Sequence, residues 1–122
     1  MFGFGDHYEE VNSGNHEGKF SHEMVAGAAS FGAMKIFEDR QRSEGKPVSH
    51  AFAKELLAGF VGGEVDKLVE TKGLDYMDSR KLKEQAVDNA YRQYDANYGD
   101  RDQWHPDYEP KFNYQDDRYN RY

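Results

Sequence analysis

Apolar residues recur every three or four positions through most of the chain, which predicts helices rather than strands. In the first such run, one helical face carries Phe20, Met24, Gly27, Phe31 and Met34. Neighbouring apolar residues widen this face beyond half of the circumference, as in the central helix of a bundle. The run predicts a helix from about Asn15 to Arg42, which Gly45 and Pro47 then end.

A second apolar run follows Ser49, a residue type that commonly caps helix N-termini. It ends at Gly73, after a basic last turn and before an apolar residue, a pattern typical of a Schellman stop. A third and less apolar run begins after Asp78 and extends to Asn97 or Tyr98. Helices with short connections tend to pack as antiparallel neighbours. The sequence therefore predicts an all-α fold, a small helical bundle of an antiparallel helical hairpin plus a third helix, with irregular aromatic-rich N- and C-terminal segments.

Composition divides the 122 residues into three parts. Residues 1–14 are a leader with glycine and aromatic residues, and residues 15–98 carry the helical periodicity. Residues 99–122 are rich in tyrosine, aspartate and arginine, with no aliphatic residue. A chain of this length suits one domain. With 37% hydrophobic and 32% charged residues, we expect one small core with polar ends.

Five glycines lie inside the first two predicted helices: Gly27, Gly32, Gly59, Gly62 and Gly63. Each glycine inside a helix costs about 1 kcal/mol relative to alanine. Close packing of the two helices is the expected compensation, because small residues let backbones approach. A local kink near Gly62 and Gly63 is the alternative.

The formal charge of −7 at pH 7 disfavours nucleic acid and anionic lipid as partners. No stretch approaches the roughly 20 apolar residues of a membrane span. The first residues lack the basic and then apolar pattern of a signal peptide. The absence of cysteine excludes disulfides and thiol chemistry. We therefore expect a cytoplasmic protein that binds neither nucleic acid nor membranes.

No recognisable catalytic or metal-binding motif is present. The five histidines are His7, His16, His22, His50 and His105. A zinc site needs three or four convergent ligands, and the histidine spacings do not suggest one. Ser21 and His22 are adjacent, which prevents the usual geometry of a base and a nucleophile. We expect no catalytic residue, no metal, no cofactor and a non-enzymatic function.

The ordered run HEGKFSHEMVAGAASF at residues 16–31 resembles the opening of the CipC-like antibiotic-response family of fungi. The resemblance continues through EGKP (44–47), SHA (49–51), KELLAGF (54–60) and DKLVETKGLD (66–75). It covers about residues 8–92 and implies an abundant cytosolic protein induced by antibiotic or other stress, without an established activity or cofactor. The sequence departs from the family at Gly32, Met34 and Gly62-Gly63, and the part beyond Gly99 lies outside the resemblance.

The tyrosine-rich C-terminal part has the composition of an interface, since tyrosine and arginine supply contact area, hydrogen bonds and cation–π contacts. The residues expected to mediate self-association are Tyr98, Trp104, Tyr108, Phe112, Tyr114, Tyr119 and Tyr122. A disordered tail and a strap folded back on the bundle are the alternatives. We expect a homo-oligomer that acts through its aromatic termini. The alternative function is a small-molecule binder that holds an apolar ligand between the first two helices, near Phe31 and Phe60.

Overall fold

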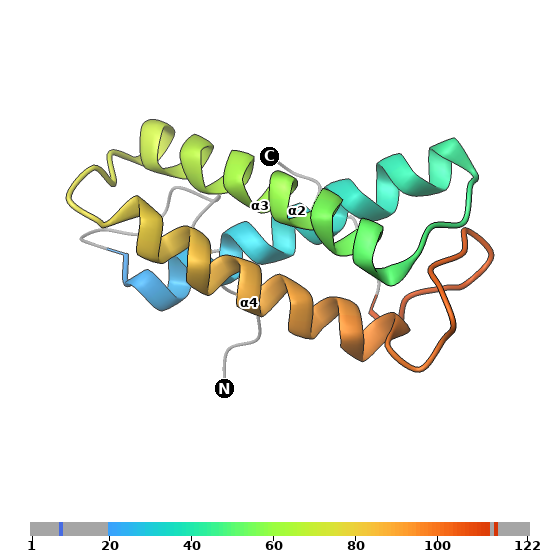
Figure 1. The fold of residues 1–122 in the computed structure, drawn as a ribbon. Helices are drawn as coiled ribbons and strands as arrows, with labels where there is room; N and C mark the ends of the chain where they lie inside the picture. Colours follow the sequence, from blue (N-terminus) through green and yellow to red (C-terminus); the bar gives the residue numbers. More distant parts are fainter. Residues whose placement is uncertain (1–7, 9–19, 113, 115–122) are drawn as a thin grey trace.

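Three α-helices make up most of the described part of the chain (Figure 1). The computed structural model describes Tyr8, residues 20–112 and Tyr114. The helices are α2 (His22–Glu44), α3 (His50–Lys72) and α4 (Ser79–Tyr98). Helices α2 and α4 run in the same direction, α3 runs antiparallel to both, and each helix packs against the other two. The predicted all-α bundle of a helical hairpin plus a third helix is confirmed.

The ends of α3 and α4 are set by local capping. The Ser49 hydroxyl accepts a hydrogen bond from the backbone N–H of Phe52 at 3.1 Å, so the first turn of α3 gains a partner. Gly73 adopts a left-handed conformation with φ 65° and ends α3. The Asp78 carboxylate accepts from two backbone N–H groups in the first turn of α4. These boundaries are the predicted ones.

Helix α2 begins later than predicted. Ser21 is extended, with φ −80° and ψ 160°, and its side chain accepts from the backbone N–H of Met24. Because an extended capping residue cannot lie inside a helix, the predicted continuous helix from Asn15 is wrong at its start. Residues 15–19 lie outside the described part. At the other end, α2 continues to Glu44, and Gly45 ends it with φ 70°.

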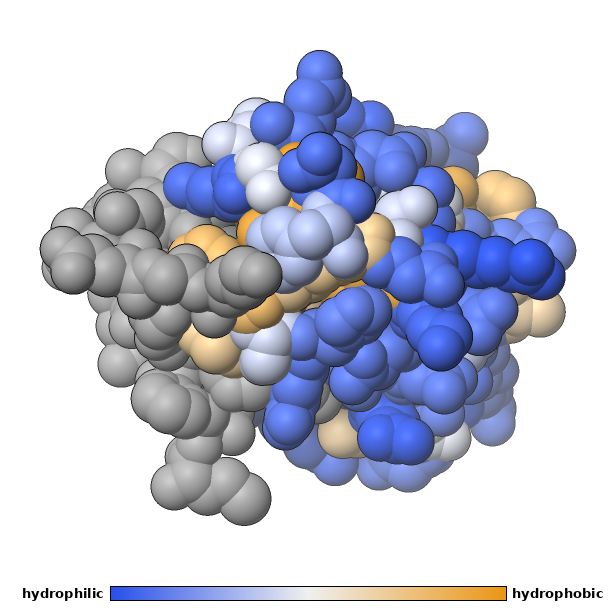
Figure 2. All heavy atoms as spheres, turned by 90° about the vertical axis from the view of Figure 1, so that its left-hand side faces the viewer, coloured by the Kyte–Doolittle hydropathy of each residue, from blue (hydrophilic) through white to orange (hydrophobic). Residues whose placement is uncertain are grey.

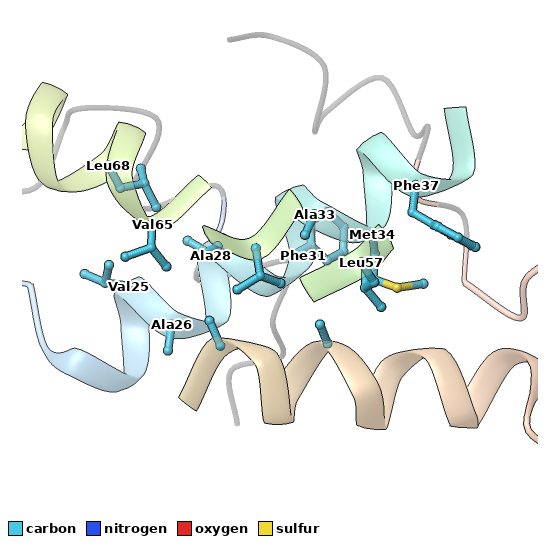
Figure 3. Close-up of a cluster of buried hydrophobic side chains, with 14 of the residues drawn as sticks. Val25, Ala26, Ala28, Phe31, Ala33, Met34, Phe37, Leu57, Val65 and Leu68 are labelled. Atoms are coloured by element: carbon cyan, nitrogen blue, oxygen red, sulfur yellow. The ribbon is translucent and has the colours of Figure 1, made fainter. Parts of the chain in front are cut away.

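Helix α2 is the central element of the core. Every residue from Val25 to Met34 is buried, so the helix is covered on several sides. Figure 3 shows apolar side chains of α3 facing those of α2, with Val65 near Val25 and Ala28, and Leu57 near Met34. The wide apolar face of the sequence therefore matches the position of the helix in the bundle.

Gly32 of α2 admits a side chain from α3. A Cβ atom at this position would lie 2.4 Å from Glu64 Oε1 and 3.3 Å from Tyr8 Cε1. The Glu64 carboxyl is mostly buried there, and burial raises its pKa against the opposing charges of Lys67 and Lys35. The close contact expected at Gly32 is thus made by a side chain rather than by the α3 backbone.

The three glycines of α3 do not mediate the close packing that the sequence suggested. No atom of the described residues lies within 4 Å of a Cβ placed at Gly59, Gly62 or Gly63. Helix α3 meets its neighbours through a different stripe, formed by Ala53, Leu57, Val61, Val65 and Leu68. The helix also passes through Gly62 and Gly63 without a break. These glycines therefore carry a helix-propensity cost that contacts among the described residues do not offset.

The described part of the face shown in Figure 2 is mostly hydrophilic. Figure 2 views the end of the molecule that bears the α3–α4 turn, and small apolar areas appear there between polar side chains. Within the described part of the chain, no helix is both long and apolar enough to cross a membrane.

Candidate ligand pocket between α2 and the C-terminal segment

Residues 99–112 and Tyr114, here called the C-terminal segment, fold back over one end of the bundle (Figure 1). The Trp104 side chain is 0% exposed. Its ring centre lies 5.5 Å from that of Phe37 and 6.2 Å from that of Tyr98. The backbones of Trp104 and Val48 exchange two hydrogen bonds, at 2.9 and 3.0 Å. In its described part, the aromatic tail is thus a strap on its own bundle.

Arg42 of α2 connects the C-terminal segment to the helices. Its guanidinium donates hydrogen bonds to the main-chain carbonyls of Pro106 and Tyr108 and to the Tyr98 hydroxyl. The guanidinium carbon also lies 5.6 Å from the centre of the Trp104 ring. Arginine carries five N–H donors in a fixed fork, so one side chain serves several acceptors at once.

Glu38 lies one helical turn before Arg42 and is 2% exposed. Its Oε1 atom accepts from Arg42 Nε at 2.8 Å, and its Oε2 atom accepts from the Tyr98 hydroxyl. Burial raises the pKa of the Glu38 carboxyl, although the Tyr98 hydrogen bond and the Arg42 charge act against this shift. Burial and the nearby Glu38 charge also raise the pKa of Tyr98. The hydroxyl therefore remains protonated at neutral pH and donates to the carboxyl group.

A second group of polar side chains joins α2, α4 and the C-terminal segment. The Tyr114 hydroxyl donates to Gln93 Oε1 at 3.0 Å and accepts from Asn97 Nδ2 at 3.1 Å. Gln93 Nε2 in turn donates to Ser30 Oγ at 3.0 Å. The backbone N–H of Lys111 donates to Asn97 Oδ1 at 2.6 Å. Polar side chains that face the segment are therefore satisfied by it, as buried polar groups require.

A pocket of about 760 Å³ lies between α2 and the C-terminal segment. The α2 wall consists of Glu38, Asp39, Arg42 and Ser43, and the opposite wall of Glu109, Pro110, Lys111 and Tyr114. Its volume is in the range of small-molecule sites. Glu38 and Arg42 are held by contacts within the chain. Within the described residues, the side chains of Asp39, Glu109 and Lys111 make no ion pair or hydrogen bond, so their charges are available to a ligand.

His50 is a structural link rather than part of this pocket. Its Nε2 atom lies 2.6 Å from the Arg101 carbonyl oxygen, and its Nδ1 atom lies 2.6 Å from the Tyr94 hydroxyl. Since a carbonyl only accepts, Nε2 carries a hydrogen and donates it to the Arg101 carbonyl, and Nδ1 is within hydrogen-bonding distance of the Tyr94 hydroxyl. In the part of the chain described, no three metal-ligating side chains gather. The other histidines are His22 and His105, which are described, and His7 and His16, which are not.

The residues predicted for self-association lie in three different environments. Tyr98, Trp104 and Tyr114 are buried in the core, and Tyr108 is partly buried against it. Phe112 is 39% exposed. Tyr119 and Tyr122 lie outside the described residues. The three buried side chains face the interior of their own chain and are not at the surface of the folded monomer.

The rings of Phe31 and Phe60, which were predicted to hold an apolar ligand, lie in different surroundings. Phe31 is 2% exposed, and its ring centre lies 5.2 Å from that of Tyr8 and 5.0 Å from that of Tyr114. Phe60 on α3 lies under Arg40, at 5.6 Å from the guanidinium carbon. The surroundings of Phe31 are therefore filled by rings of the same chain, and the pocket lies beside the C-terminal segment instead.

Sequence reasoning did not single out Glu38 and Arg42. A signal was present, because Phe31, Met34 and Glu38 continue one apolar face at steps of three and four residues. A carboxyl group on such a face is buried, and a buried carboxyl needs a hydrogen-bonding or charged partner. Arg42, four residues further along, is the partner that the helix geometry provides.

Fold and pocket together define a small helical protein in which the three described helices pack together and the C-terminal segment completes their core. A family model described as "Virulence factor CipC-like" matches residues 7–97. The chain therefore belongs to the CipC-like family. The match ends before the C-terminal segment begins. No curated protein and no solved structure gave a match.

Proposed function

We propose that this CipC-like protein is a non-enzymatic, cytoplasmic stress-response protein that binds a small polar molecule in the pocket between α2 and the C-terminal segment. The observation that carries the proposal is the pocket itself, of about 760 Å³, with three charged side chains that have no partner in the described chain. The sequence suggested an apolar ligand between α2 and α3. We propose instead a polar ligand in the pocket between α2 and the C-terminal segment.

The charges in the pocket favour a ligand that bears an amine. Asp39 and Glu109 present carboxylates from opposite walls, and Lys111 presents one ammonium group. A basic nitrogen between the two carboxylates would be stabilised by both. An anionic group on the same molecule would pair with Lys111. We therefore propose basic or zwitterionic small molecules as the ligand class.

Binding without catalysis is supported by the roles of the most perturbed groups. Glu38, whose pKa is raised by burial, is hydrogen-bonded to Arg42 and Tyr98. A general acid or base must reach a proton of the substrate, whereas these groups are engaged with one another. The family description and the resemblance to antibiotic-response proteins of fungi support a role in the response to stress or to a host.

Isothermal titration calorimetry with arginine and with spermidine as probes tests this proposal, together with native mass spectrometry of the gently purified protein. We expect at least one probe to bind, and Asp39→Asn with Glu109→Gln to weaken its affinity by about 10-fold, because two opposite charges are removed. Asp75→Asn with Asp88→Asn removes the same charge away from the pocket and serves as the control.

Two outcomes would contradict the proposal. The first is that neither probe binds and the native mass shows no co-purified molecule. The second is that the control pair weakens binding as much as the pocket pair, which would assign the effect to the net charge of −7 rather than to the pocket.

A further inference from the structure

Helix α3 presents an apolar face that the described residues cover only in part. Phe52 is 48% exposed, and Leu56 and Phe60 are only partly buried. Gly59 and Gly63 lie beside them and are exposed. Because these positions are separated by three or four residues, they share one side of the helix. This side differs from the stripe of Leu57, Val61 and Val65 that packs into the core.

The two halves of this face differ in size. Its N-terminal half carries the large side chains of Phe52 and Leu56, whereas in its C-terminal half Phe60 lies between Gly59 and Gly63, which have no side chain. No described atom lies within 4 Å of a Cβ added at either glycine. Two glycines four residues apart form a shallow groove that lets a second helix approach closely. A partner for this face must offer bulk opposite the glycines and space opposite Phe52.

We propose that α3 is the contact surface for a second copy of this chain, in an antiparallel α3–α3 pair about a two-fold axis near Gly59. In such a pair, Leu56 packs on the partner's Gly63, and Phe52 lies towards the partner's Lys67. A two-fold axis brings the large half of each face onto the small half of the other, as an isologous interface requires. Antiparallel helix dipoles add a favourable contribution.

Charge and size set the strength of this pair. The Lys67 side chain is 60% exposed, and its ammonium group lies 4.0 Å from Glu64 Oε2 of the same helix, so in the dimer it would have to contact an aromatic ring of the partner beside this ion pair. The face from Phe52 to Lys67 is about 22 Å long, from the rise of 1.5 Å per residue, so the interface is of the small and transient kind. Each copy carries a charge of −7, which opposes association. Added salt screens that repulsion and should strengthen the dimer. The contact is independent of the ligand pocket.

Sedimentation equilibrium over a range of protein concentrations tests the proposal. We expect the wild-type mass to rise from monomer towards dimer, and Gly59→Leu with Gly63→Leu to weaken the dimer by at least about 10-fold. A second variant, Gly59→Ala with Gly63→Ala, should weaken the dimer while it raises the melting temperature, because alanine favours the helix. A weaker dimer together with a higher melting temperature would show that the variant loses the contact and not the fold.

Gly62→Ala is the matched control. It makes the same chemical change in the same helix, with equal space around the added Cβ, but at the flank of the face, about 60° around the helix from Gly59 and about 100° from Gly63. We expect this variant to gain thermal stability and to dimerise as the wild type does. The proposal is overturned if the wild type is monomeric at every concentration, or if the Gly59 and Gly63 variants dimerise like the wild type.

Discussion

Replacing Trp104 with alanine is expected to lower the free energy of unfolding by about 3–5 kcal/mol, as for other fully buried large aromatic residues. Trp104 is 0% exposed and packs against Phe37 and Tyr98. The variant would leave a cavity between α2, α4 and the C-terminal segment. Urea unfolding followed by far-ultraviolet circular dichroism measures the change, since the variant has no tryptophan fluorescence.

Phe112→Ala is the comparison for this experiment. Phe112 belongs to the same segment and is also aromatic, but it is 39% exposed. Its removal should therefore cost clearly less than the removal of Trp104. A Trp104→Ala loss below about 1 kcal/mol, the typical value for an ordinary substitution, would show that the C-terminal segment is not part of the core.

Arg42→Met is the second substitution with a large expected effect, a loss of about 2–4 kcal/mol at pH 7.5. Removing one partner of a buried ion pair leaves the other charge without compensation. Here Glu38 would keep its burial but lose the hydrogen bond at 2.8 Å from Arg42 Nε. The carbonyls of Pro106 and Tyr108 would also lose their donor. The expected loss is smaller than the roughly 3–5 kcal/mol typical of a fully buried ion pair, because the Arg42 side chain is partly exposed.

The stability deficit of Arg42→Met should depend on pH. Burial already raises the pKa of Glu38 in the folded protein, and the Arg42 charge opposes this rise, so its loss raises the pKa further. A carboxyl with a raised pKa in the folded state favours folding when protonated, and this contribution is lost as pH rises through the folded pKa. We therefore expect the deficit to be largest above that pKa and to shrink as pH falls towards the ordinary glutamate value of 4.5.

A double variant gives the control for this interpretation. Arg42→Met with Glu38→Gln removes the charge that Arg42→Met leaves behind, so it should recover part of the stability and lose most of the additional pH dependence. Urea unfolding at pH 5 and pH 7.5 compares the three proteins. An Arg42→Met deficit that is equal at both pH values would contradict the role assigned to Glu38.

The parts of the fold that sequence reasoning obtained are those set by local chemistry. Ser49, Gly73 and Asp78 each act on the turn next to them, so their residue types and positions were enough to place the helix ends. The start of α2 was missed because the apolar periodicity of the sequence continues through Phe20. The Ser21 cap interrupts the helix although the pattern does not change there.

The parts that escaped prediction depend on contacts between distant residues. Arg42 meets Pro106 across 64 positions, and Glu38 meets Tyr98 across 60. The C-terminal segment contains no aliphatic residue, so its composition indicated a polar tail or an interface. Its buried members are aromatic: the Tyr114 hydroxyl is hydrogen-bonded, whereas the Trp104 Nε1 atom has no hydrogen-bond partner among the described residues. The glycines of α3 were assigned to a neighbour in the same chain because periodicity alone does not show which side of a helix is covered.

The fluorescence of Trp104 tests most directly whether the C-terminal segment completes the core of its own chain. Trp104 is the single tryptophan of the protein, so its emission reports on this position alone. At a concentration where light scattering gives the monomer mass, the account predicts blue-shifted emission and strong protection from acrylamide, both lost in urea. Emission at the wavelength of free tryptophan with ready quenching in the folded monomer would contradict it.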